Sequence, residues 1–314
     1  MSTLTITTIQ TDLFWEDKAA NLQRFEDKIN AIRENTEVII LPEMFSTGFS
    51  MKPETLAEKM DGPTLGWMKK IAAQKKVILT GSLIVEEGGN YFNRLIWMLP
   101  NGQYGFYDKR HRFAYAGEDD HYTAGKKRLI ASVKGWKVNL LVCYDLRFPV
   151  WSRQGPAFAG SRIQGKNIRD PQTSDNEPSA APPVAPLAGP PPNNPSEIRS
   201  DPSQDSGKIT APEYDLLIYV ANWPERRSHA WKTLLQARAI ENQSYVVGVN
   251  RVGEDGNKIA HSGDSMIIDP LGEVLYHGIK EEAVYTYTLR KDKLEDVRSR
   301  FPFWRDADHF SVYP

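Results

Sequence analysis

The chain has 314 residues, of which 40% are hydrophobic and 25% charged, values typical of a globular protein with one large domain or two smaller ones. Its formal net charge is −1 and it has no basic block, which argues against nucleic acid as the main partner. It has no signal-peptide pattern, no apolar run of the length that spans a membrane and only one cysteine, so we expect a cytoplasmic protein with no membrane contact.

Strand-like and helix-like segments alternate along the chain. Leu4 to Ile9 alternates with period two, whereas residues 18–33 place apolar side chains three and four apart, as an amphipathic helix does. Further strands are predicted at residues 38–41, 77–85, 91–99, 103–107, 130–133, 136–142, 214–221, 245–250, 262–269, 272–277 and 283–289, and further helices at residues 64–74, 228–242 and after the last strand. This mixture predicts an α/β or α+β layered sandwich.

Residues 154–213 differ from the rest of the chain. They contain 12 of the 21 prolines and a single aromatic residue, Phe158. Such a composition buries too little apolar surface to offset the entropy of ordering, which predicts a disordered or polyproline-like loop. The strands on either side look like neighbours in one sheet, so we interpret the segment as an insertion into a single domain spanning residues 1–314. A proline-rich docking site for a partner is the alternative.

Cys143 is the only cysteine and has no intramolecular disulfide partner. It follows the predicted strand that ends at Val142 and precedes a turn, where a nucleophile and the next backbone N–H can act together in acyl transfer. Free cysteine is also among the most buried residue types. From this segment alone, packing and catalysis both remain open.

A cysteine nucleophile needs a base, and none of the six histidines stands in a protease-like signature. A carboxylate is the alternative. Glu43 follows the strand at 38–41 and Lys109 follows the strand at 103–107, so both side chains can converge with Cys143 at one rim of a sheet. Taken singly, each charge is typical of a solvated loop. No metal-ligand spacing and no dinucleotide-binding glycine motif is present, so we expect neither a metal nor a cofactor.

Together the three segments resemble the motifs of the nitrilase superfamily, the carbon–nitrogen hydrolases. The matching motifs are Leu41-Pro42-Glu43-Met44-Phe45, Tyr107-Asp108-Lys109-Arg110-His111 and Val142-Cys143-Tyr144-Asp145-Leu146-Arg147-Phe148-Pro149. The resemblance covers residues 1–153 and 214–310 and implies an α-β-β-α sandwich with a Glu-Lys-Cys triad.

By that resemblance Glu43 is the general base, Cys143 attacks the carbonyl carbon, and Lys109 with the backbone N–H of Tyr144 stabilises the oxyanion. A second glutamate of the family falls on Glu118, where it positions Lys109 or the substrate. We also expect the charge of Lys109 to ease formation of the thiolate.

Further segments resemble the omega-amidase branch, which hydrolyses the terminal amide of 2-oxoglutaramate and 2-oxosuccinamate. They are Ala221-Asn222-Trp223-Pro224, Ala237-Arg238-Ala239-Ile240-Glu241-Asn242, Val249-Asn250-Arg251-Val252-Gly253 and Phe301-Pro302-Phe303. The distal carboxylate of such a substrate requires a fixed cation. The candidates are Arg112, Arg226 and Arg227, with Trp223 as a wall, although each arginine on its own is typical of a surface charge.

Two features depart from the family pattern. Arg112 stands where we expect a leucine, so it either reshapes the pocket or points outward. The insertion follows Trp151-Ser152-Arg153, near a region that forms the family's subunit interface, which puts the expected homodimer or larger oligomer in doubt. The alternative functions are an aliphatic nitrilase, an N-carbamoyl amidohydrolase, and a non-catalytic scaffold that binds partners through the insertion.

Overall fold

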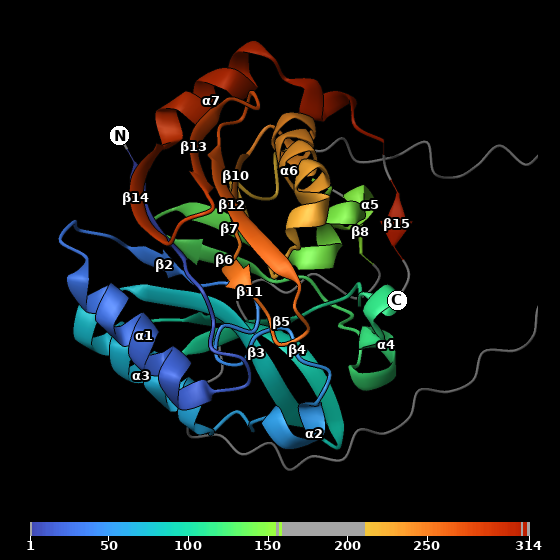
Figure 1. Cartoon of the computed structure of the whole chain (residues 1–314). Coiled ribbons are helices and arrows are strands. Elements are labelled where there is room, and N and C mark those ends of the chain that lie inside the picture. The colour runs from blue at the N-terminus through green and yellow to red at the C-terminus, as the bar shows by residue number, and fades with distance from the viewer. Residues whose placement is uncertain (1, 155–156, 159–210, 309, 313–314) are drawn as a thin grey trace, which may run out of the picture.

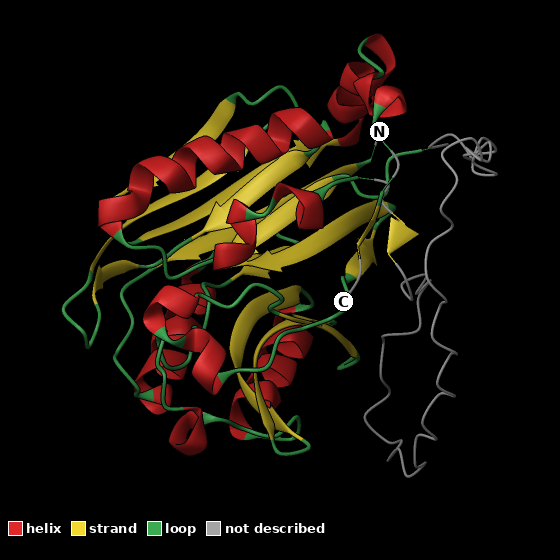
Figure 2. Ribbon diagram, turned by 90° about the vertical axis from the view of Figure 1, so that its right-hand side faces the viewer, coloured by secondary structure: helices red, strands yellow, loops and turns green. Residues whose placement is uncertain are grey.

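The computed structural model describes residues 2–154, 157–158, 211–308 and 310–312. Two β-sheets pack face to face, and helices cover their outer faces (Figures 1 and 2). The predicted α-β-β-α sandwich is therefore confirmed. Most of the predicted disordered insertion at 154–213 lies outside the described residues. In the described part of the chain, no helix is long and apolar enough to cross a membrane.

The first sheet has six strands, in the spatial order β14 (Ala283–Arg290), β1 (Thr3–Gln10), β2 (Val38–Ile40), β3 (Ile78–Glu87), β4 (Asn90–Met98) and β5 (Tyr104–Asp108). The strands β1, β2 and β3 are parallel, and parallel neighbours need a crossover connection. The helices α1 (Lys18–Ala31) and α3 (Pro63–Lys75) lie in these crossovers and pack side by side on the outer face (Figure 1).

The second sheet contains β11 (Val252–Glu254), β12 (Ala260–Ile268), β10 (Tyr245–Val249), β9 (Leu216–Val220), β7 (Trp136–Val142) and β6 (Ile130–Val133), with β13 (Val274–Ile279) also paired to β12. The helix α6 (Ser228–Asn242) packs on its outer face (Figure 1). The parallel pair β7 and β9 comes from the two sides of the proline-rich segment, as the sequence predicted.

The remaining elements are short or peripheral. They are α2 (Pro53–Leu56), α4 (Glu118–His121), α5 (Pro149–Ser152), α7 (Lys291–Arg300), and the two-residue strands β8 (Ala157–Phe158) and β15 (Ser311–Val312), which pair with each other. The loops between the elements also include 3₁₀ turns at Ala114–Ala116, Cys143–Arg147, Glu225–Arg227 and Phe303–Asp306.

The strand β2 shows why the sandwich forms. Successive side chains of a strand point to opposite faces. Val38 and Ile40 pack in the cluster between the two sheets, whereas Ile39 and Leu41 pack in the cluster under α1 and α3. A strand buried on both faces reads as an unbroken apolar run, which is the pattern of residues 38–41.

Candidate active site

Four strands, two from each sheet, are each followed by a residue of the candidate active site. Glu43 follows β2, Lys109 follows β5, Cys143 follows β7 and Asn222 follows β9. The Lys109 ammonium lies 2.9 Å from Glu43 Oε1, and the backbone N–H of Asn222 donates to Glu43 Oε2 at 2.8 Å. The structure thus brings together side chains that lie up to 179 positions apart in the sequence.

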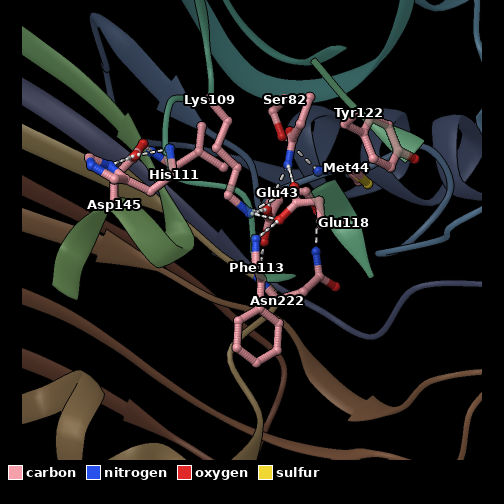
Figure 3. Close-up of polar contacts among 12 residues, drawn as sticks. Glu43, Met44, Ser82, Lys109, His111, Phe113, Glu118, Tyr122, Asp145 and Asn222 are labelled. Carbon is pink, nitrogen blue, oxygen red and sulfur yellow. Dashed lines mark hydrogen bonds and ion pairs between the residues drawn. The ribbon is translucent and has the colours of Figure 1, made fainter. Parts of the chain in front are cut away.

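Lys109 lies between two carboxylates. Its Nζ donates to Glu43 and also to both oxygens of Glu118, at 3.0 and 2.8 Å (Figure 3). The side-chain amide of Asn93 donates to Glu43 Oε1 at 2.7 Å and to Glu118 Oε1 at 3.3 Å. All four side chains are buried, with at most 2% exposure. A buried charge is tolerated when it is paired and hydrogen-bonded, and this cluster meets that condition for each of its charges.

Burial and neighbouring charges set the protonation states of these groups. Burial disfavours the charged form of Lys109, but the carboxylates of Glu118 and Glu43 outweigh that effect, so its pKa is raised. Burial raises the pKa of Glu118, and the charge of Lys109 opposes the rise. Lys109 is therefore a fixed cation at neutral pH.

The Cys143 thiol is protonated at neutral pH. Burial raises its pKa well above the ordinary value, and Glu43 adds to the rise through its charge and through a hydrogen bond to the thiol. We expected Lys109 to ease thiolate formation, and its charge does lower this pKa, but burial and Glu43 dominate. A reaction at this sulfur would therefore require a proton acceptor for the thiol.

The backbone of Cys143 is in the left-handed region, with φ of +44°. A residue other than glycine is uncommon there, and such conformations cluster at functional sites. Cys143 begins the 3₁₀ turn Cys143–Arg147, and the first N–H groups of a helical turn have no acceptor within the turn. The N–H of Tyr144 is one of these groups.

Asp145 holds this turn against the loop that carries Lys109. Its Oδ2 accepts hydrogen bonds from the N–H of Val142 at 3.0 Å and the hydroxyl of Tyr107 at 2.7 Å. Its Oδ1 accepts from the backbone N–H of His111 at 3.0 Å and lies 2.8 Å from His111 Nδ1 (Figure 3). The carboxylate is fully buried. The turn that carries Cys143 and the loop that carries Lys109 are therefore fixed to each other through one side chain.

Cys143 borders a cavity of about 540 Å³. Of the predicted substrate-binding residues, Trp223, Arg226 and Arg227 line this cavity, as does Tyr144. Arg112 is not among its lining residues, and its guanidinium instead donates to the carbonyl oxygen of Tyr122 at 2.9 Å. The structure therefore does not bring Arg112 to the cavity.

A sequence model of the carbon–nitrogen hydrolase family matches residues 5–183 and 208–299. The chain belongs to the carbon–nitrogen hydrolase family. Among curated relatives, the omega-amidase YafV of Escherichia coli strain K12 is 37% identical over 314 residues, with 100% of both chains covered. The 2-oxoglutaramate amidase of Bacillus subtilis strain 168 is 27% identical, with 96% of each covered.

Solved structures agree with this assignment. XC1258 of Xanthomonas campestris, a CN-hydrolase superfamily protein with an arsenic adduct in its active site, has a TM-score of 0.81 and 35% identity over 100% of both chains. Nit3 of Saccharomyces cerevisiae, a member of the nitrilase superfamily, has a TM-score of 0.70 and 19% identity, covering 96% of this chain and 94% of its own, and shares the fold. The predicted membership of the nitrilase superfamily is confirmed.

This carbon–nitrogen hydrolase has four site residues that sequence reasoning did not single out. Asp145 and Arg147 stand inside the cysteine motif, and Asn222 stands two residues after β9 inside the quoted segment Ala221-Asn222-Trp223-Pro224, so those motifs were the available signal. Asn93 lies within β4 and carries no such signal. Among the described residues, no group of three His, Cys, Asp or Glu side chains is arranged to hold a metal ion.

Proposed function

We propose that this carbon–nitrogen hydrolase cleaves the terminal amide of a small carboxylate, of the 2-oxoglutaramate or 2-oxosuccinamate class, to the acid and ammonia. The observation that carries the proposal is the ammonium of Lys109 held between Glu43 and Glu118, next to the Cys143 thiol at the cavity. The full-length similarity to an omega-amidase and to a 2-oxoglutaramate amidase supports the substrate class.

In the first half of the proposed reaction, Glu43 accepts the thiol proton while the sulfur of Cys143 adds to the amide carbon. The resulting oxyanion is stabilised by the Lys109 ammonium and the backbone N–H of Tyr144. Glu43 then gives its proton to the amide nitrogen, the C–N bond breaks, and ammonia leaves a thioester on Cys143.

In the second half, Glu43 accepts a proton from water, whose oxygen adds to the thioester carbon. The tetrahedral intermediate collapses, the C–S bond breaks, and the sulfur recovers the proton from Glu43 as the acid departs. The hydrogen bonds from Asn93 and from the N–H of Asn222 support this role, because they hold the Glu43 carboxylate in one orientation through both halves. Glu118 is the positioning residue for Lys109.

An ammonia-release assay tests the reaction class. We expect turnover of 2-oxoglutaramate and none by Cys143→Ala, because the chain has no second thiol to replace the nucleophile. Glutamine, an aliphatic nitrile and an N-carbamoyl amino acid are the comparison substrates. Turnover of only the nitrile or only the carbamoyl compound would assign another branch of the superfamily. No turnover, with a thiol inert to iodoacetamide, would favour the scaffold.

Two further expectations from the sequence stay predictions. One is a cytoplasmic location, and the other is a homodimer or larger oligomer. Light scattering on the purified full-length chain measures the oligomeric state directly.

A further inference from the structure

The cavity beside Cys143 has an excess of positive charge. Among the described residues, the lysine and arginine side chains that line it are Lys52, Arg147, Arg226 and Arg227. Lys52 forms an ion pair of 3.0 Å with Glu16. Within the described part of the chain, the three arginines have no carboxylate at ion-pair distance.

The carboxylates of the cavity wall are already engaged. Glu16 accepts hydrogen bonds from Lys52 and, at 2.7 Å, from the hydroxyl of Ser50. Asp255 accepts from the backbone N–H groups of Asn257 and Ile259, at 2.8 and 3.0 Å. Neither acid neutralises an arginine, so the positive charge in the cavity is available to a ligand.

Two of the three arginines are held by aromatic rings. The guanidinium of Arg147 lies over the ring of Trp223 at 5.0 Å from its centroid, and that of Arg227 lies over the ring of Phe113 at 4.9 Å. Both are partly buried, whereas Arg226 is exposed. An arginine stacked on a ring keeps its in-plane N–H donors free to bind a carboxylate in a bidentate manner.

Both stacked arginines are fixed relative to the reacting groups. Arg147 ends the same 3₁₀ turn that Cys143 begins. Under Arg227, the backbone N–H of Phe113 donates to Glu118 at 2.5 Å, and the ring of Phe113 lies 5.0 Å from that of Tyr144. The distance from these cations to Cys143 is therefore set by short, partly buried connections.

The cations also repel one another. Burial and the charge of Arg226 lower the pKa of Arg227, and Arg147 contributes in the same direction. Like charges placed together without an internal counter-ion are relieved by an anionic ligand.

We propose that Arg147 and Arg227 together bind the carboxylate of the substrate at the end opposite the scissile amide, and that Arg147 is a specificity-determining residue. This assignment rests on the proposed function and narrows it to short monocarboxylate amides whose anionic end reaches this pair. Arg226, on the exposed rim, contributes little to the preference.

Succinamate and succinamide test the proposal, because they differ only in a carboxylate against an uncharged amide of the same shape. We expect the wild-type chain to prefer succinamate. Arg147→Gln and Arg227→Gln each lower kcat/KM for succinamate by about 30-fold, as the loss of a charged hydrogen bond predicts, and leave succinamide nearly unchanged. Arg226→Gln is the matched control and retains the wild-type preference. Arg147→Lys keeps the positive charge but lacks the planar guanidinium, so its kcat/KM for succinamate lies between those of the wild type and Arg147→Gln.

A second measurement does not depend on turnover. Succinate protects Cys143 from iodoacetamide in the wild type and in Arg226→Gln, and fails to protect it in Arg147→Gln and Arg227→Gln. If the wild type hydrolyses no amide while succinate still protects, the proposed reaction fails and the carboxylate site stands. If the Arg147 and Arg227 variants keep both the protection and the succinamate preference, the carboxylate assignment is wrong. Unchanged succinamide turnover shows that the variants are folded.

Discussion

The buried cluster around Lys109 differs from the group of arginines in the cavity in how its charges are balanced. In the cluster each charge has its partner inside the protein, since Lys109 binds both Glu43 and Glu118. In the cavity, Arg147 and Arg227 rest on aromatic rings and have no acidic partner among the described residues. In the proposed mechanism, the groups that move protons are therefore aligned before the substrate arrives, whereas the groups proposed to recognise it keep their charge unneutralised.

The largest expected effect comes from neutralising one charge of the buried cluster. Glu43→Gln removes the proposed general base, so we expect kcat to fall by about 10² to 10⁴. It also removes a negative charge that raises the pKa of Cys143, so that pKa falls. The pH midpoint of iodoacetamide alkylation should therefore shift to lower pH while turnover is lost.

Turnover and the pH midpoint of alkylation together distinguish the loss of a proton acceptor from unfolding of the variant. Unfolding would expose the thiol and would bring the midpoint to the ordinary cysteine value, with a loss of circular dichroism signal. An alkylation midpoint that rises, or stays unchanged in a folded Glu43→Gln variant, would contradict the assigned electrostatics. Glu37→Gln is the matched control, because that carboxylate is partly exposed and pairs with Lys134 away from the cluster.

A smaller effect is expected from replacing Asp145, which connects the turn that ends at Arg147 to the loop that carries Lys109. Asp145→Ala leaves the buried Tyr107 hydroxyl and the N–H of Val142 without their acceptor. We expect the free energy of unfolding to fall by about 3 kcal/mol, the cost of a few orphaned buried donors. Chemical denaturation measures this loss, and Asp119→Ala, at an exposed position, is the control.

Asp145 is also expected to act on the rate through position. With the turn that carries Cys143 loosened, we expect kcat for succinamate to fall while KM changes little, because Asp145 does not line the proposed substrate cavity. A loss of kcat/KM that comes from a higher KM, with kcat unchanged, would show that Asp145 contributes to substrate binding instead.

The sequence predicted nearly all long elements, because their apolar periods are strong and each packs into a core cluster. It did not predict α2, α4 or β11, which span four, four and three residues and are too short to show a period. Polar residues that follow strands could be predicted to lie together, because strands that end at one rim of a sheet bring them close. A polar residue inside a strand gives no such signal. Asn93 is a polar residue inside a strand, and only the three-dimensional structure places its amide between two carboxylates.

Arg112 illustrates the same limit, and its substitution carries the smallest expected effect. From sequence, Arg112 and Arg227 were equal candidates for the distal carboxylate, but Arg112 donates to the carbonyl oxygens of Tyr122 and Asp119. Arg112→Leu should therefore lower the free energy of unfolding by about 1 kcal/mol, since the loop loses one good hydrogen bond. The preference for succinamate over succinamide should stay at the wild-type value. A loss of that preference in a folded Arg112→Leu variant would mean that this arginine turns into the cavity when substrate binds, and the division between structural and recognising arginines would have to be redrawn.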